Sequence, residues 1–97
     1  MARRVIPTAF PADPELITCE ELGAAVRAAR TASGLTLEEA ALAVSIAKQT
    51  LGDREAGRPT VGVGIALRVA KALGVSLFVA PAGEASSISR LIRESRE

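Results

Sequence analysis

The chain has 97 residues, which is enough for one compact domain, and its formal net charge of +1 gives no electrostatic argument for nucleic acid. With no histidine and a single cysteine, Cys19, the sequence excludes zinc sites, an intramolecular disulfide and histidine-based catalysis. Hydrophobic residues make up 48%, but Phe10 and Phe78 are the only aromatic ones, which argues against a roomy, aromatic-lined ligand pocket. We therefore expect neither an enzyme nor a protein with a metal or cofactor.

Residues 1–18 are expected to form an N-terminal arm. Pro7, Pro11 and Pro14 forbid a continuous helix in this stretch, and 5–10 has the composition of a short extended segment. The first residues contain two arginines but no apolar stretch of signal-peptide length, and no run in the chain approaches the roughly 20 apolar residues that span a bilayer. We therefore expect a cytoplasmic protein without a membrane partner.

A capping box predicts the first helix. Thr18 and Glu21 match the Ser/Thr-x-x-Glu pattern, in which each side chain accepts a hydrogen bond from the backbone of the other residue. The helix is expected over about 19–33, with Gly34 after it as the C-terminal cap. Its apolar positions recur at spacings of three and four and form one stripe: Leu22, Ala25, Val26 and Ala29.

A second capping box, Thr36 with Glu39, begins a helix that is expected to reach Val44. The helical pattern breaks at 45–46, and a third helix fits from 47 or 48 to 55. Two short helices joined by about three residues form a helix-turn-helix arrangement. Such a unit needs a small residue at the helix crossing and apolar residues between the helices, and the chain supplies them in order: Ala41, Val44, Ile46 and Leu51.

The rest of the chain predicts another core helix, a strand and a last helix. The fourth helix is expected over about 62–73. Residues 75–80 are apolar and rich in β-branched side chains, which predicts a short strand. A lone strand leaves its backbone unsatisfied, so we expect it to pair with a symmetry mate or with residues 5–10. The last segment is expected either as a helix to about residue 96, capped by Ser86 or Ser87, or as a frayed tail.

Several residues between Leu22 and Leu77 match a known pattern in order and spacing: Gly34, Leu35, Thr36, Glu39, Ala41, Ile46, Thr50, Leu51, Glu55, Gly57 and 70–75. On these residues the chain resembles the Cro/lambda-repressor-like (XRE) helix-turn-helix family. The resemblance implies an all-α, lambda-repressor-like bundle of four to five helices, with the 47–55 helix as the recognition helix in the major groove.

Residues 55–61 and 73–79 resemble narrower groups within this family. They are similar to antitoxins that partner HipA-like kinase toxins, and to small plasmid and phage repressors. In that antitoxin group the segment after the fourth helix is a strand that pairs across the dimer axis. Two positions depart from the family pattern: Leu37 replaces a glutamine that contacts a phosphate, and Ser45 replaces a glycine in the turn, where a left-handed conformation suits serine less well.

The outer face of the 47–55 helix carries the candidate DNA contacts. Lys48 can donate to guanine and Gln49 can pair with adenine, the alternative being that both are solvated residues of a surface helix. Ala47 lies beside them at the start of the helix. Thr50 is expected to contact a phosphate, unless it acts only as a helix cap.

Four further residues complete the candidate DNA-binding set. Gly52 costs about 1 kcal/mol relative to alanine within a helix, which close approach to DNA or loose packing would equally explain. Asp53 would repel phosphates unless it accepts from a cytosine amino group. Arg54 either flanks the core or faces a phosphate, and Arg58 is expected at a phosphate as a backbone clamp. Glu55 is interpreted as structural, paired with an arginine or capping backbone.

The local charge of residues 34–58 is unfavourable for DNA binding, although their sequence pattern favours it. Between residues 34 and 58 three basic residues face four acidic ones: Lys48, Arg54 and Arg58 against Glu38, Glu39, Asp53 and Glu55. Arg3 and Arg4 would compensate by reaching a groove, unless the start of the chain is disordered. With so few cationic contacts, binding by a monomer is expected to be weak, and dimerisation would double the contacts.

The sequence therefore predicts an N-terminal arm (1–18), a helix-turn-helix DNA-binding domain (19–74) and a dimerisation segment (75–97). The predicted function is a homodimeric transcriptional repressor whose partner is double-stranded operator DNA with a palindromic sequence. One alternative is an antitoxin that also neutralises a toxin protein. The other is a protein-interaction module without DNA binding, which the net negative motif and Leu37 favour and the Lys48-Gln49-Thr50 run opposes.

Overall fold

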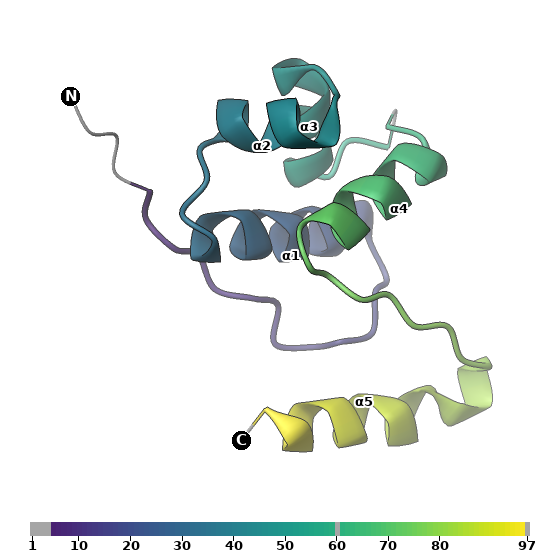
Figure 1. The fold of residues 1–97 in the computed structure, drawn as a ribbon. Helices are drawn as coiled ribbons and strands as arrows, with labels where there is room; N and C mark the ends of the chain where they lie inside the picture. The colour runs from purple at the N-terminus through teal and green to yellow at the C-terminus, as the bar shows by residue number, and fades with distance from the viewer. Residues whose placement is uncertain (1–4, 60, 97) are drawn as a thin grey trace.

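The computed structural model describes residues 5–59 and 61–96. The secondary structure of this part of the chain is entirely helical (Figure 1): α1 (Cys19–Ala32), α2 (Leu37–Val44), α3 (Lys48–Glu55), α4 (Val63–Ala72), the 3-10 turn η1 (Ala82–Glu84) and α5 (Ala85–Ser95). The expected all-α bundle of four to five helices is confirmed. No helix among the described residues has the length and apolar character of a transmembrane span.

Both predicted capping boxes are present. Thr18 Oγ1 accepts from the Glu21 amide at 3.2 Å, and Glu21 Oε1 accepts from the Thr18 amide at 2.9 Å. Thr36 and Glu39 form the same pair of bonds at the start of α2, at 3.2 and 2.8 Å. Each cap contributes about 1 kcal/mol, and the two together fix where the first two helices begin.

The core lies where α1, α2, α3 and α4 meet. α1 packs against α3, α3 against α2, and α2 against α4. Its side chains are small and aliphatic, and the largest fully buried ones are Leu51, Val26 and Val69. Ala41, expected at the helix crossing, is 3% exposed. A core of this kind leaves little distance between helix axes, so the contacts between backbones decide the packing.

One such contact lies between α1 and α3. A Cβ atom added at Gly23 would lie 2.5 Å from the backbone oxygens of both Arg54 and Glu55. Real Cβ atoms do not approach so closely, and backbone at the end of a helix cannot move aside as a flexible side chain can. Gly23 is therefore the residue that allows α3 to lie directly on α1.

A buried ion pair joins the same two helices. Arg30 Nε lies 2.6 Å from Glu55 Oε2 and Nη2 lies 3.0 Å from Oε1, while Nη1 donates to the Leu35 carbonyl at 2.8 Å. The two side chains are 10% and 8% exposed. The predicted structural role of Glu55 as the partner of an arginine is thereby confirmed, and the pair ties the end of α3 to the loop that follows α1.

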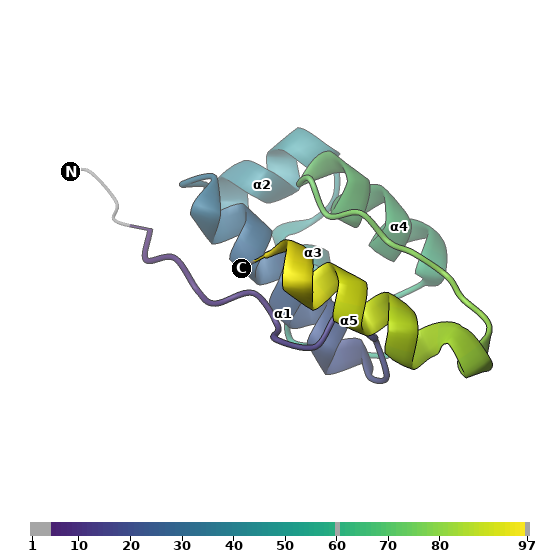
Figure 2. The same ribbon diagram turned by 90° about the horizontal axis from the view of Figure 1, so that it is seen from below.

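The arm and α5 are held by each other. Figures 1 and 2 show the described part of the arm running through the space between α1 and α5. Arg96 donates to the Pro11 carbonyl at 3.0 Å and its guanidinium lies 5.1 Å from the centre of the Phe10 ring, while Arg93 lies 3.8 Å from Asp13. Arg3 and Arg4, expected to reach a groove, lie outside the described residues.

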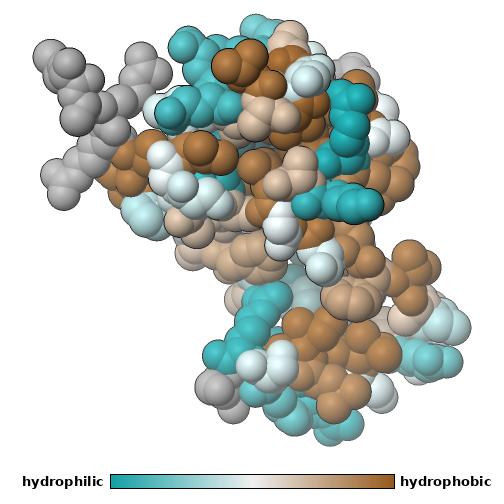
Figure 3. All heavy atoms as spheres, in the orientation of Figure 1, coloured by the Kyte–Doolittle hydropathy of each residue, from teal (hydrophilic) through white to brown (hydrophobic). Residues whose placement is uncertain are grey.

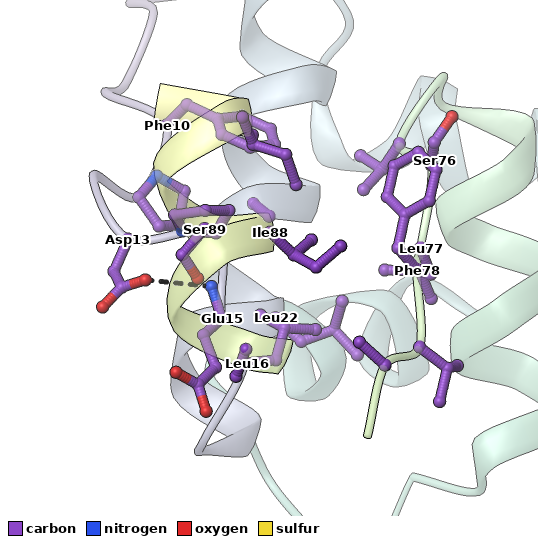
Figure 4. A pocket seen from close by; sticks show the side chains of 18 of the residues that line it. Phe10, Asp13, Glu15, Leu16, Leu22, Ser76, Leu77, Phe78, Ile88 and Ser89 are labelled. Atoms are coloured by element: carbon purple, nitrogen blue, oxygen red, sulfur yellow. Dashed lines mark hydrogen bonds between the residues drawn. The ribbon is translucent and has the colours of Figure 1, made fainter. Parts of the chain in front are cut away.

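A groove separates α5 from the helical body, and it corrects one expectation. Its volume is about 530 Å³, and its walls are the arm, α1, residues 75–80 and α5 (Figure 4). Both phenylalanines of the chain line it, and Ile88 points into it from α5. The expectation that a chain with two aromatic residues forms no roomy, aromatic-lined pocket is wrong, because the arm folds back and adds a wall that periodicity does not reveal.

The predicted strand at 75–80 is also corrected. These residues form no strand in the described chain, and no backbone hydrogen bond joins 76–80 to another described segment. Residues 5–10, one of the two proposed partners, do not pair with it, since the Thr8 amide donates to Thr31 Oγ1 on α1 at 3.0 Å. A strand is defined by pairing, so 75–80 within one chain has only the composition of a strand.

The last segment is helical, so the alternative of a frayed tail is wrong. α5 starts at Ala85, directly after η1, and no side chain caps it. The expected cap at Ser86 or Ser87 is therefore wrong as well, because the 3-10 turn already supplies the first turn of backbone geometry and the serines fall inside the helix.

Candidate nucleic-acid interface

The turn between α2 and α3 sets the orientation of the exposed helix. Ser45 has φ 62° and ψ 46°, and it is the only non-glycine residue with positive φ in the described chain. The amides of Ser45 and Ile46 donate to the carbonyls of Leu42 and Ala41 and close α2. The replacement of glycine by Ser45 favoured an altered turn, but the serine keeps the left-handed conformation, at a cost of about 1–2 kcal/mol that glycine would avoid.

α3 is buried on one side and open on the other. Leu51 is fully buried against α1, α2 and α4, whereas Ala47, Lys48 and Gln49 are exposed. The remaining candidates on this side are half-buried or exposed: Thr50, Gly52, Asp53 and Arg58. α2 and α3 lie at the end of the molecule opposite α5 (Figure 1). Seven of the eight candidate residues, all but Arg54, are thus accessible from solvent around this helix.

Arg54 is placed differently from the others and is a correction to the candidate set. It is 3% exposed, and its Nη2 donates to the carbonyl of Cys19 at 3.1 Å. The side chain therefore belongs to the contact between α3 and the first turn of α1, where it satisfies backbone, and it lies beyond the reach of a phosphate. Of its two expected roles, the core-flanking one is confirmed.

The departure at Leu37 has a packing explanation. Its side chain packs against the main hydrophobic cluster, and its Cδ2 is the nearest atom, at 3.6 Å, to a Cβ built at Gly52. That distance is ordinary van der Waals contact, so an alanine fits at position 52 without moving anything. The packing of the protein itself therefore does not require glycine at position 52, and both predicted reasons, close approach to DNA and loose packing, stay open.

Carboxylates hold the polar side chains of this face. Lys48 Nζ lies 3.3 Å from Glu38 Oε1 on α2. Asp53 Oδ1 lies 3.3 Å from Gln49 Nε2 and 3.4 Å from Arg58 Nε. The contact of Glu38 with Lys48 was not predicted, because the two residues are ten positions apart and the sequence gives no hint of contact until the turn is known. The i,i+4 spacing of Gln49 and Asp53 was the one available signal.

Among the described residues, no group of histidine, cysteine, aspartate and glutamate side chains is arranged to hold a metal ion. The accessible chemistry of the face is therefore that of hydrogen-bond donors and acceptors on a protruding helix. That is the chemistry with which a helix recognises base edges and phosphates in the major groove.

A family model described as helix-turn-helix matches residues 26–79, more than half of the chain. The chain belongs to the XRE-type helix-turn-helix family. The clp gene regulator ClgR from Corynebacterium glutamicum has 34% sequence identity to this chain, and its crystal structure matches with a TM-score of 0.55. The match covers 86% of this chain and 87% of ClgR. Membership in this family identifies the chain as a DNA-binding protein of the transcription-regulator type.

Two further solved structures share the fold. A complex named HipB(S29A)-O2 20mer has a TM-score of 0.63 at 19% identity, covering 70% of this chain and 94% of that one. A structure named MDT Protein has a TM-score of 0.62 at 19% identity, covering 70% and 96%. No curated protein matches the sequence significantly.

Proposed function

We propose that the chain is a homodimeric transcriptional repressor that acts in the cytoplasm and inserts α3 into the major groove of a palindromic operator. The observation that carries this proposal is that α3 is buried on one side and exposed on the other. Leu51, Arg54 and Glu55 fix its inner side to α1 and the core, so Lys48 and Gln49 project from a helix that cannot rotate. Rigid presentation of side chains is what direct readout of bases requires.

Lys48→Ala/Gln49→Ala is expected to reduce affinity for the operator by about 10- to 100-fold or more, because each good contact with a base edge contributes about 1–3 kcal/mol. The measurement is fluorescence anisotropy with dye-labelled duplexes taken from upstream of the gene and from a random pool. Lys71→Ala, which removes one exposed cation from the last turn of α4, is the control and should bind within about twofold of wild type.

Failure of the folded wild type to select any duplex from the random pool would contradict the repressor proposal. The interaction module without DNA binding would then take its place.

The proposed dimer is supported by exposed hydrophobic side chains on the side of the molecule that carries the groove. Phe78, Val79 and Leu91 are 76%, 100% and 64% exposed, and hydrophobic side chains gather on the lower part of the molecule in Figure 3. The unpaired backbone at 76–80 would pair with its symmetry mate and remove this surface from water. On this proposal 19–74 binds DNA, 75–97 dimerises and 1–18 supports the groove.

Val79→Lys is expected to raise the dissociation constant of the dimer by about two orders of magnitude, since burying a valine contributes about 1.5 kcal/mol or more and the change occurs twice in a symmetric interface. Sedimentation equilibrium against the 10.0 kDa mass of one chain measures it. Val63→Lys, at a 75% exposed valine of α4, is the matched control and should leave the dimer intact. A wild type that stays monomeric at every concentration would refute the dimer.

An antitoxin is the second candidate, favoured by the shared fold with the HipB structure. It would bind DNA in the same way and also neutralise a partner toxin. The test is co-expression with the product of the neighbouring gene. A stable complex that abolishes the toxicity of that product supports the antitoxin, and two independent proteins without mutual effect exclude it for that gene pair.

A further inference from the structure

Asp53 lies on the exposed side of α3, where its carboxylate accepts a hydrogen bond from Gln49 and forms an ion pair with Arg58. Its Oδ1 lies 3.3 Å from Gln49 Nε2 and 3.4 Å from Arg58 Nε. The Asp53 side chain is 28% exposed, whereas that of Arg58 is 66% exposed. We call these three residues the Asp53 clamp.

The clamp occupies the atoms that DNA would need. A bidentate pair with adenine uses one Nε2 hydrogen and the amide oxygen of a glutamine, so the bond from Nε2 to Asp53 fixes the direction of the Gln49 amide and leaves only its second hydrogen for a base. The ion pair with Arg58 likewise neutralises a cation expected at a phosphate. Breaking the contacts of the Asp53 clamp costs little free energy, because exposed pairs contribute little to stability. It leaves an unpaired carboxylate facing the nucleic acid.

The second carboxylate of the face behaves differently. Glu38 pairs with Lys48 at 3.3 Å, but its side chain is 65% exposed and projects from the first turn of α2. A long, exposed glutamate can swing into solvent when DNA approaches. The Asp53 side chain is short, partly buried and part of α3 itself. When α3 enters the groove, this carboxylate enters with it and needs a hydrogen-bond donor there.

We propose that Asp53 is a specificity-determining residue of α3: it holds Gln49 and Arg58 on non-cognate DNA and releases them where a cytosine amino group takes their place. This rests on the proposed function, in which α3 enters the major groove. Of the two base amino groups that donate in that groove, cytosine N4 is the usual partner of a carboxylate, since adenine N6 lies beside the N7 acceptor; a cognate half-site therefore contains a C·G pair opposite Asp53. Elsewhere the carboxylate meets acceptors and phosphates, and binding is penalised.

The test compares Asp53→Ala with Glu38→Ala, since both remove one carboxylate from the same face. Anisotropy is measured on the selected operator and on a scrambled duplex of equal length, at several salt concentrations, with circular dichroism to verify folding. Asp53→Ala is expected to bind scrambled DNA about tenfold more tightly and to lose about tenfold of the operator-to-scrambled ratio. Glu38→Ala is expected to tighten both duplexes by the same factor. A second arm replaces each C·G pair of the half-site in turn, and one replacement should weaken wild type but not Asp53→Ala.

The outcomes separate the two proposals. If folded wild type prefers no duplex, the repressor proposal fails and the clamp falls with it. If wild type selects an operator but both variants shift the two duplexes equally, the repressor proposal stands and the role of Asp53 is overturned. An operator half-site without any C·G pair sensitive to Asp53→Ala overturns it as well.

Discussion

Glu55→Ala is expected to lower the free energy of unfolding by about 3–5 kcal/mol, because it leaves the Arg30 guanidinium buried without its carboxylate. The pair is bidentate, at 2.6 and 3.0 Å, and both side chains are about nine-tenths buried. A loss of this size is a large part of the 5–15 kcal/mol that typically stabilises a domain. Urea denaturation followed by far-ultraviolet circular dichroism measures it, since the chain has no tryptophan or tyrosine for fluorescence.

The control for this change is the double variant Arg30→Met/Glu55→Met. Removing both charges takes away the unpaired ion as well as the pair, so the double variant should recover most of the stability lost in Glu55→Ala. A Glu55→Ala protein that unfolds at the same urea concentration as wild type would show that the guanidinium finds water or another acceptor, and that the pair does not hold α1 to α3.

Gly23→Ala is expected to destabilise the fold by about 3 kcal/mol, at the upper end of the usual cost of overpacking. The added methyl group would lie 2.5 Å from two carbonyl oxygens at the end of α3, so one helix must move away from the other. Helix propensity alone predicts the opposite sign, since alanine is favoured over glycine by about 1 kcal/mol inside a helix. Thermal unfolding by circular dichroism decides between the two effects.

Gly64→Ala is the matched control for this prediction. Gly64 lies in α4, and a Cβ there meets nothing within 4 Å. The same substitution should therefore stabilise the protein slightly, by up to about 1 kcal/mol. Equal stabilisation of both variants would contradict the prediction that α1 and α3 approach each other too closely at Gly23 to admit a methyl group.

The local part of this structure was predictable from the sequence. Both capping boxes lie within four consecutive residues, and the geometry of a helix N-terminus depends on little else. Ser45 could be identified as strained because the family pattern has a glycine in the turn. A structural role for Glu55 was predicted, but pairing with an arginine and capping of backbone were both left open, and the structure shows the pair with Arg30.

Features that depend on distant segments were not predictable in this way. Arg54 was assigned to two surroundings because charge favours the surface, and only the carbonyl of Cys19, 35 positions earlier, explains its burial. The hollow beside α5 needs the arm to return past α1, which no periodicity encodes. The strand at 75–80 is a different case, since a segment pairs only if a partner is present, and composition describes the segment alone.

The bond between Pro11 and Arg96 joins positions 85 residues apart, whereas the helices around Leu51 meet through much shorter loops. Closing a long loop costs more chain entropy than closing a short one, and contacts between distant positions form late. We therefore expect α1 to α4 to reach their native packing while the groove still lacks a wall. On that order of folding, α3 is complete before the surface proposed to join two copies exists.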